Sequence, residues 1–413
     1  MPVVGPLRGL YLIVGVLVGV LLPFVPVILS QRGFSAPQIG LLMALTAVGY
    51  VVGMPAWGHL GDVVLGRRRA LQVAVLGSAA AALAFGAPLA LPLVAVAIVT
   101  YYVVQSGAGM LTDAIAMHVL VAHPDRYGRF RLLESASFAV AALAAGVAYD
   151  VVGYWLAYPL AAFSAVLVAI MCVWVIDAPR ARLADYRADG PRDPDGALVS
   201  PRGGRAGRWR EATGSIGVAV AVSPRLLGVL AAAVLVHMGV LASSTFLPLR
   251  LAELGGAPSV IALSSTVSAL FEIPAMFAAA RLASRVGLRG LFASGCLLYA
   301  IAFGTWIVLA DPLLIVASRV LSGLAYGSLT VAIVLTVGAL LPARLQATGQ
   351  ALYGMSASGI ASIVGNLGGG VLFGSYGHGP VFAAGLVGAL VAALVAWRYF
   401  PARGHVRLDV ARR

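Results

Sequence analysis

The hydrophobic residues of this sequence lie in long runs, and glycine, proline and charged residues separate one run from the next. A helix needs about 20 apolar residues to cross the ~30 Å hydrocarbon core of a bilayer. In lipid the backbone polar groups must be satisfied internally, which runs of this length achieve as helices. The pattern predicts an all-α membrane protein with twelve transmembrane helices, near residues 8–30, 37–59, 70–90, 92–121, 130–150, 154–176, 225–249, 258–280, 289–309, 313–340, 344–373 and 380–399.

The composition excludes other classes of protein. Of the 413 residues, 61% are hydrophobic and 10% charged, which a water-soluble globular protein cannot accommodate. The net charge is +13, but the arginines stand between apolar runs, so we expect no nucleic-acid partner. Cys172 and Cys296 lie inside apolar runs without metal-type spacing, and the chain has no P-loop. We therefore expect core cysteines, no metal, no cofactor and no direct use of ATP.

The arginines also predict the topology, because cytoplasmic loops carry the excess of basic residues. All 28 basic residues are arginines. With the N-terminus in the cytoplasm, 25 of them fall on the cytoplasmic side, only Arg32 and Arg250 lie outside, and Arg319 lies within a span. The first run lacks a cleavage pattern and is expected to be a retained span. We expect a multi-pass protein of the plasma (inner) membrane with both termini cytoplasmic.

One long segment cannot span a membrane. Residues 177–223 are rich in proline, glycine, arginine and aspartate, which is typical of a flexible cytoplasmic linker. It separates an N-terminal six-helix bundle, residues 1–176, from a C-terminal six-helix bundle, residues 224–400, and a basic cytoplasmic tail follows at 401–413.

The two predicted bundles share sequence features. Phe24-Val25-Pro26 matches Phe246-Leu247-Pro248 at an offset of 222 residues, and Gly33 matches Gly255 at the same offset. Gly153 matches Gly377 at an offset of 224. An even number of spans in each half keeps the two copies in the same orientation, so the repeat is parallel. Two similar bundles around a shared interface are typical of transporters that work by alternating access.

A loop motif carries a family resemblance. Gly58-His59-Leu60-Gly61-Asp62 followed by Gly66-Arg67-Arg68-Arg69 resembles the signature between helices 2 and 3 of the major facilitator superfamily. The resemblance implies two six-helix bundles, transport of a small molecule, and a cytoplasmic gate formed by Gly58, Asp62, Gly66, Arg67, Arg68 and Arg131. A carboxylate at Asp62 suits this role, because it can bond the N-terminal end of a helix in the other bundle in one state and release it in another.

Four further stretches are similar to the branch of that superfamily that includes the phenylpropionate permease and, more distantly, lactose permease. They are residues 22–42, Tyr127-Gly128-Arg129-Phe130-Arg131, Phe271-Glu272-Ile273-Pro274 and residues 344–350. The branch usually has Trp-Gly-Ser soon after its Tyr-Gly-Arg motif, whereas this chain has Leu133-Glu134-Ser135, which adds a carboxylate.

Ionisable residues inside spans are costly, about 2.5–3.5 kcal/mol each, and are the first candidates for function. The expected helices at 92–121 and 130–150 form a hairpin that turns near Asp125, which places Glu134 near His118 and Arg131. The alternative is that Arg131 and Glu134 only neutralise each other near the cytoplasmic surface. Asp113 lies deeper without a basic residue at helical spacing, and a carboxyl group in such surroundings suits a proton carrier.

The second half of the chain contributes three more candidates. Glu272 stands nine residues before Arg281, about 13 Å deeper in the membrane, and has either a coupling role or a role in an internal ion pair. His237 either pairs with Glu272 or hydrogen-bonds to a neighbouring helix. Arg319 shares one helix face with Gly323 and Gly327, where it can meet a carboxylate or an anionic substrate.

Together these features predict a secondary active transporter, not an enzyme, that is driven by the proton gradient and acts as a monomer. The alternatives are efflux of toxic amphipaths by the same fold and a membrane receptor or scaffold without turnover. Five tyrosines lie in or near the expected spans 8–30, 37–59, 92–121 and 313–340: Tyr11, Tyr50, Tyr101, Tyr102 and Tyr326. They indicate either an aromatic or amphipathic substrate or anchoring at the membrane interfaces.

Overall fold

The computed structural model describes residues 4–120, 127–175 and 218–401, and the described chain is helical. The predicted linker 177–223 lies mostly, and the tail 401–413 almost wholly, outside the described residues. The α-helices are α1 (Val4–Gly19), α2 (Val25–Gln31), α3 (Ala36–His59), α4 (Arg67–Phe85), α5 (Leu91–Val119), α6 (Tyr127–Val152), α7 (Ala157–Met171), α10 (Arg225–Glu253), α11 (Pro258–Val308), α12 (Pro312–Leu340), α13 (Ala343–Gly354), α14 (Ala361–Tyr376) and α15 (His378–Tyr399). The 3₁₀-helices η1 (Leu22–Phe24), η4 (Tyr154–Leu156) and η5 (Cys172–Trp174) and the π-helices η2 (Leu60–Val64) and η6 (Met355–Ile360) join some of them.

Eleven stretches of the described residues are long and apolar enough to cross a membrane. They correspond to eleven of the runs expected from the sequence, and the remaining run, 70–90, forms α4. Three arginines, Arg67 to Arg69, occupy the first turn of α4 and lower its mean hydropathy. The first run is interrupted at Pro23, because proline donates no backbone hydrogen bond. The run expected at 344–373 consists of α13, η6 and α14 in succession.

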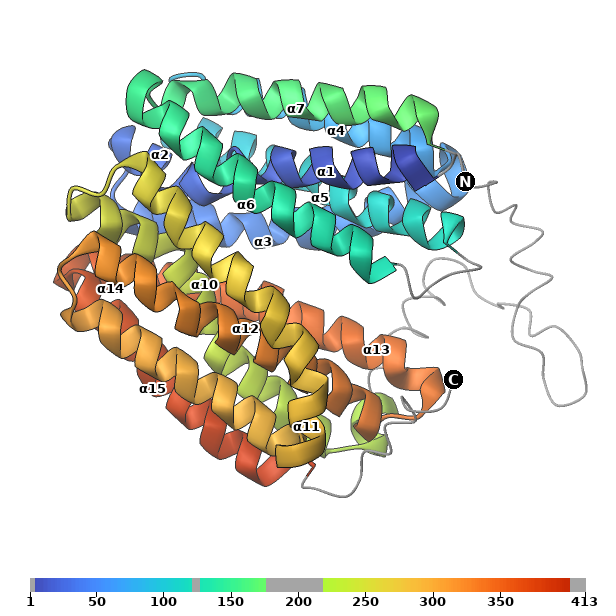
Figure 1. Ribbon diagram of the computed structural model, residues 1–413, viewed down its shortest axis with the longest axis vertical. Coiled ribbons are helices and arrows are strands. Elements are labelled where there is room, and N and C mark those ends of the chain that lie inside the picture. Colours follow the sequence, from blue (N-terminus) through green and yellow to red (C-terminus); the bar gives the residue numbers. More distant parts are fainter. Residues whose placement is uncertain (1–3, 121–126, 176–217, 402–413) are drawn as a thin grey trace, which may run out of the picture.

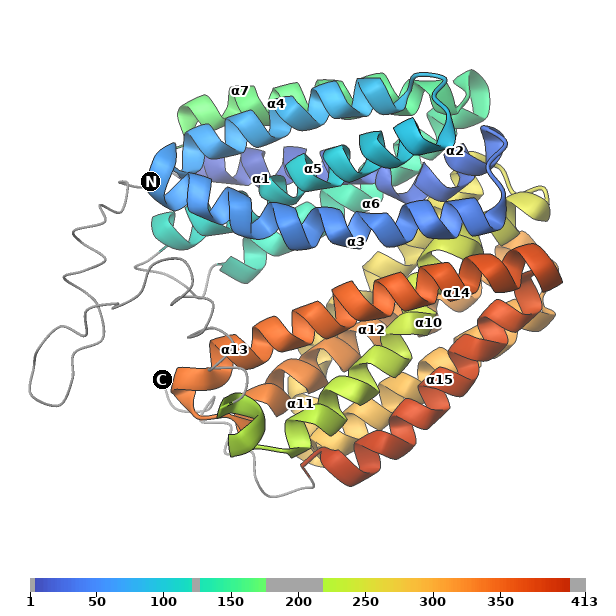
Figure 2. The same ribbon diagram turned by 180° about the vertical axis from the view of Figure 1, so that it is seen from behind.

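The helices lie in two groups, α1–α7 and α10–α15 (Figures 1 and 2). The N and C labels lie at one end of the molecule, and α2 lies at the other end. Between the groups α3 packs on α14, and α6 packs on α11. Cys172 and Cys296 are fully buried, as expected of core cysteines.

The backbones of the two helix groups approach closely near the beginning of α3. A methyl group added at Gly40 would collide with the backbone of Asn366 and Gly370 on α14. On the other side, a methyl group at Gly146 of α6 would lie 2.9 Å from the carbonyl oxygen of Pro258 on α11. Glycine at these positions therefore allows the two backbones to approach each other closely.

Aromatic residues mark both ends of two peripheral helices. Trp155 and Trp174 lie just outside the two ends of α7. Tyr376 lies just before α15, and Trp397 lies in its last turn. Each of these four residues is at least 60% exposed. The members of each pair stand roughly 30 Å apart at the helical rise of about 1.5 Å per residue. This distance matches the hydrocarbon core of a bilayer, at whose interfaces Trp and Tyr gather.

Candidate functional site

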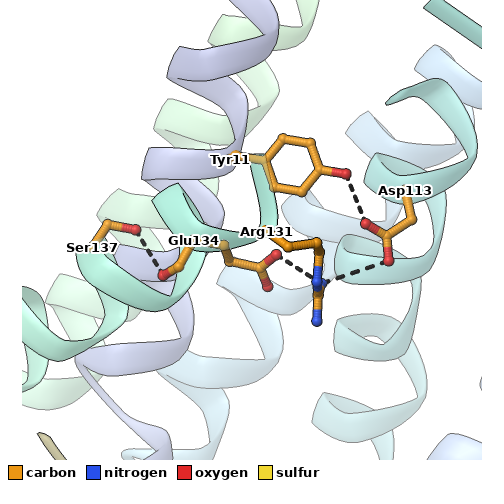
Figure 3. Close-up of polar contacts among 5 residues, drawn as sticks. All are labelled: Tyr11, Asp113, Arg131, Glu134 and Ser137. Atoms are coloured by element: carbon orange, nitrogen blue, oxygen red, sulfur yellow. Dashed lines mark hydrogen bonds and ion pairs between the residues drawn. The ribbon is translucent and has the colours of Figure 1, made fainter. Parts of the chain in front are cut away.

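Four side chains from three helices of the first group form a polar chain (Figure 3). The hydroxyl group of Tyr11 on α1 donates a hydrogen bond of 2.7 Å to Oδ1 of Asp113 on α5. The other oxygen of Asp113 lies 3.6 Å from Nη1 of Arg131 on α6. The same nitrogen donates a hydrogen bond of 2.8 Å to Oε2 of Glu134. Asp113, which has no arginine along its own helix, is thus paired with one on α6.

Close packing of α1 on α6 helps to position this chain. A side chain at Gly15 would collide with the backbone of Glu134 and with the hydroxyl group of Ser137. That hydroxyl group donates a hydrogen bond to the backbone carbonyl of Glu134, whose side chain is only 17% exposed. Since one guanidinium group faces two carboxylates, the cluster has one surplus negative charge when both are ionised. A proton or a cationic group can neutralise it.

Glu272 of α11 faces this cluster from the second group. It lines a cavity of about 540 Å³ together with Arg131 and Glu134, and it lies within electrostatic reach of Arg131. Val18 of α1, Phe138 of α6 and Phe277 of α11 supply part of the apolar lining. The cavity therefore combines charged groups from both helix groups with apolar walls. His118, which was expected near Glu134, is exposed.

Within the described residues His237 is not paired with Glu272 and makes no hydrogen bond to a neighbouring helix. Its Nδ1 atom donates a hydrogen bond of 2.8 Å to the carbonyl oxygen of Ala233, one turn earlier on α10. The neutral ring then keeps Nε2 as an acceptor, because a carbonyl oxygen can only accept. The rings of Tyr326 and Tyr353 pack edge-on against the imidazole, 6.4 and 5.9 Å away between centroids.

The contacts of Arg319 differ from one of its two expected partners, a carboxylate. Within the described residues its guanidinium group meets no carboxylate. It donates a hydrogen bond of 3.3 Å to the carbonyl oxygen of Ser264 and stacks over the ring of Trp306, 5.4 Å from the centroid. Gly323 and Gly327 instead pack against the backbone of α11, at Ser268 and Glu272. The face they share with Arg319 thus serves the packing of α12 on α11.

All the predicted gate residues except Arg131 lie between the last turn of α3 and the first turn of α4, with Asp62 in η2. Nε of Arg67 donates a hydrogen bond of 2.9 Å to Asp62, within the same helix group, and Nη1 donates one of 3.0 Å to the carbonyl oxygen of Ala114. Gly66 has φ of 83° and makes the turn into α4 possible. Because Ala114 follows Asp113, Arg67 links the gate motif to the ionic cluster.

The remaining gate candidates divide between two places. Gly58 lies in the last turn of α3, and Arg68 follows Arg67 in α4. Arg131 belongs to the ionic cluster with Asp113 and Glu134 and not to the contacts around Asp62.

Three site residues are not evident as such from the sequence. Tyr11 enters the cluster only through its contact with α5, and Tyr353 and Thr330 complete the group around His237. The Thr330 hydroxyl group lies beside the phenol groups of Tyr326 and Tyr353, and its oxygen is buried without a hydrogen bond within the described residues. Among the other tyrosines, Tyr102 packs against Tyr50 and Tyr101, with ring centroids 5.6 and 5.4 Å apart.

Comparisons with known proteins agree with this architecture. The model of the MFS_1 like family matches residues 6–384. A maltose permease of Geobacillus stearothermophilus is 30% identical over 399 residues, which cover 92% of this chain and 91% of the permease.

Solved structures show the same fold. A mutant form of the nucleoside transporter NupG has a TM-score of 0.78 at 15% identity, covering 96% of this chain and 99% of that one. A D-xylose-proton symporter has a TM-score of 0.68 at 15% identity, covering 98% and 99%. The chain therefore belongs to the MFS_1 like family of membrane transporters and is not an enzyme.

Proposed function

We propose that this protein is a proton-coupled secondary transporter that carries a small hydroxylated molecule by alternating access. The observation that carries the proposal is the cavity in which Arg131 and Glu134 face Glu272 from the opposite helix group. A substrate bound there contacts both groups, so their relative movement can expose it to one compartment and then to the other.

Backbone geometry supports twelve spans in two parallel repeats, 1–176 and 224–400. All glycines with positive φ within the described residues form three pairs: Gly33 with Gly255, Gly66 with Gly287, and Gly153 with Gly377. The members of a pair are separated by 222, 221 and 224 residues. The same turns thus recur in the same order in both halves, and α4 occupies the position of the third span.

The arginine distribution supports cytoplasmic termini in the plasma membrane. The tight seams, α3 on α14 and α6 on α11, lie at the end opposite the termini. In this orientation the structure is closed toward the outside. The 177–223 linker then joins the bundles on the cytoplasmic side, and we propose a monomer as the transporting unit.

The surplus negative charge of the cluster supports proton coupling. Asp113 and Glu134 share one guanidinium group, and Glu272 adds a third carboxyl group across the cavity. Protonation of one carboxyl group changes which of the others Arg131 neutralises. Such a change can alter the attraction between the two helix groups, which is what coupling requires.

The substrate class follows from the cavity and from the similar proteins. Maltose permease is a relative that this chain matches over 91% of the permease's length, and the sequence resembles the branch that includes lactose permease. Charged groups beside Phe138 and Phe277 suit an amphipathic molecule, such as a sugar with a polar edge and an apolar face. His237, Tyr326, Tyr353 and Thr330 offer further hydrogen-bonding groups in the second group of helices.

Purified protein in liposomes tests this function. Maltose and related sugars are first screened for an increase in melting temperature, since a ligand that binds the folded state stabilises it. A stabilising sugar should then accumulate in response to an imposed pH gradient, in a direction that separates import from efflux. Binding without any flux would favour a receptor and refute the proposal.

Replacing His237 with Phe should weaken binding of the stabilising sugar by about two- to tenfold, the equivalent of one hydrogen bond. The phenyl ring keeps the packing against Tyr326 and Tyr353 but removes the Nε2 acceptor. Isothermal titration calorimetry measures the effect. His378→Phe is the matched control, because His378 is the first residue of α15 and packs on Phe382, away from Tyr326 and Tyr353. Equal affinities for the wild type and His237→Phe would exclude His237 from the sugar site.

Asp62→Asn should slow transport by about three- to tenfold and leave sugar affinity unchanged. The exposed ion pair with Arg67 is worth less than about 1 kcal/mol to stability, so folding should be preserved. Initial uptake rates and calorimetric affinities separate the two effects. Arg69→Ala, an exposed arginine of the same turn, should behave like the wild type. A normal rate for Asp62→Asn would rule out the gating role.

A further inference from the structure

The two seams that close one end of the molecule are equivalent by the internal repeat. Gly146 packs on Pro258 and Ala262 of α11, and Gly370 packs on Ala36 and Gly40 of α3. Gly370 follows Gly146 by 224 residues, while Pro258 and Ala262 follow Ala36 and Gly40 by 222. The same contact thus occurs twice, once on each side of the interface.

One position breaks this equivalence. Asp150, near the C-terminal end of α6, accepts a hydrogen bond of 2.9 Å at Oδ1 from the backbone N–H of Ser259. Ser259 is the second residue of α11, so the carboxylate of one helix group caps a helix of the other group. At the equivalent place on the other seam stands Gly374, which contacts the ring of Pro37. Proline has no N–H to donate, so a carboxylate at position 374 could not make the bond that Asp150 makes to Ser259.

The Asp150 contact is suited to hold the two groups together. It is one of two hydrogen bonds that join them within the described residues, and the other runs from Thr266 to the carbonyl oxygen of Ala139 on the same seam. A negative charge at a helix N-terminus interacts favourably with the helix dipole and with its unpaired N–H groups. Separation of α6 from α11 at this end breaks this charge-assisted bond.

We propose that Asp150 is a positioning residue of the transport cycle, a latch that bonds the N-terminus of α11 while this end is closed and releases it when this end opens. Asp62 was expected from the sequence to form such a bond between bundles, yet in this structure it contacts Arg67 of its own group. The latch rests on the proposed alternating access, and it assigns a carboxylate-to-helix bond to the end opposite the termini.

The test measures distances between spin labels across this end in the full chain reconstituted in nanodiscs. Cysteines for labelling replace Val151 on α6 and Glu253 on α10, both exposed, and the two native cysteines are buried. Asp150→Ala should increase the population with the long spin-label distance, relative to that with the short distance, about three- to tenfold. Asp150→Asn keeps an acceptor oxygen without the charge and should give an intermediate ratio.

Asp311 provides a matched control. Its carboxylate caps the N-terminus of α12 through the N–H groups of Leu313 and Leu314, but it and α12 belong to the same helix group. Asp311→Ala should lower the melting temperature without changing the distances. An unchanged ratio in both Asp150 variants, or an equal change with Asp311→Ala, would overturn the latch.

A wedge variant tests alternating access separately. Gly146→Leu places a side chain against Pro258 and Ala262 and should populate the long distance regardless of Asp150. If the wedge opens this end and the Asp150 variants do not, the latch fails while alternating access stands. If no variant, the wedge included, yields a second distance, the proposed alternating access fails and the latch with it.

Discussion

Glu272→Gln is expected to abolish accumulation of the substrate against its gradient while leaving substrate exchange in place. A difference of one pH unit is worth about 1.4 kcal/mol, so one proton per substrate supports roughly tenfold accumulation. Glutamine keeps the size and the hydrogen-bonding capacity of the side chain but cannot carry a proton. Accumulation should therefore fall from about tenfold to equality between the compartments.

Paired assays in liposomes make this result specific. Counterflow of labelled sugar requires binding and reorientation but no gradient, so it should persist in Glu272→Gln. Glu253→Gln is the control, because Glu253 is an exposed glutamate whose partner is Arg250, 3.8 Å away in the same turn. Wild-type accumulation by Glu272→Gln would show that the carboxyl group of Glu272 is not the coupling site.

Arg131→Met is expected to have the largest effect on binding, weakening it by about 10- to 100-fold. Removing one partner of a buried ion pair costs about 3–5 kcal/mol, and the half-exposed side chain of Arg131 reduces this to about 1–3 kcal/mol. Methionine retains the length of the side chain but leaves Asp113 and Glu134 without their shared cation. The melting temperature of the unliganded protein should fall as well.

Two further variants separate the charge effect from loss of packing. Arg129→Met removes an exposed arginine two residues earlier on α6 and should behave like the wild type. Combining Arg131→Met with Asp113→Asn removes one negative charge and should restore much of the lost melting temperature, though not the binding. If Arg131→Met alone binds sugar with normal affinity, the ionic cluster is only a structural element.

Much of the fold could be predicted from the sequence because its cause is local. An apolar run of about 20 residues forms a helix in lipid whatever surrounds it, so the spans are recognisable one by one. The contact between Arg131 and Glu134 is also local, since residues three apart lie on the same helix face. The turns at Gly66 and Gly153 depend on positive φ, which glycine accepts.

The structure gives His237 and Arg319 contacts that the sequence did not predict, and for a common reason. A carboxylate was one expected partner of each side chain. Arg319 donates instead to the carbonyl oxygen of Ser264 on α11, and His237 donates to that of Ala233 on its own helix, while both contact aromatic rings. Which group lies next to a buried polar side chain depends on how helices are rotated about their axes. That rotation depends on the packing of many side chains, and no single span specifies it.

The sequence by itself determined the membrane location, the helical spans and the surplus of carboxyl groups inside them, because these depend on neighbouring residues along the chain. The tertiary structure alone decided that Tyr11 bonds Asp113, 102 residues away, and that Asp150 caps a helix 109 residues away. Such pairs form only where close helix packing brings distant segments within hydrogen-bonding distance. The physical reason is that a hydrogen bond requires two particular atoms within about 3 Å of each other, which depends on the packing. The hydrophobic effect depends on each residue's own apolar surface, which can be read from the sequence.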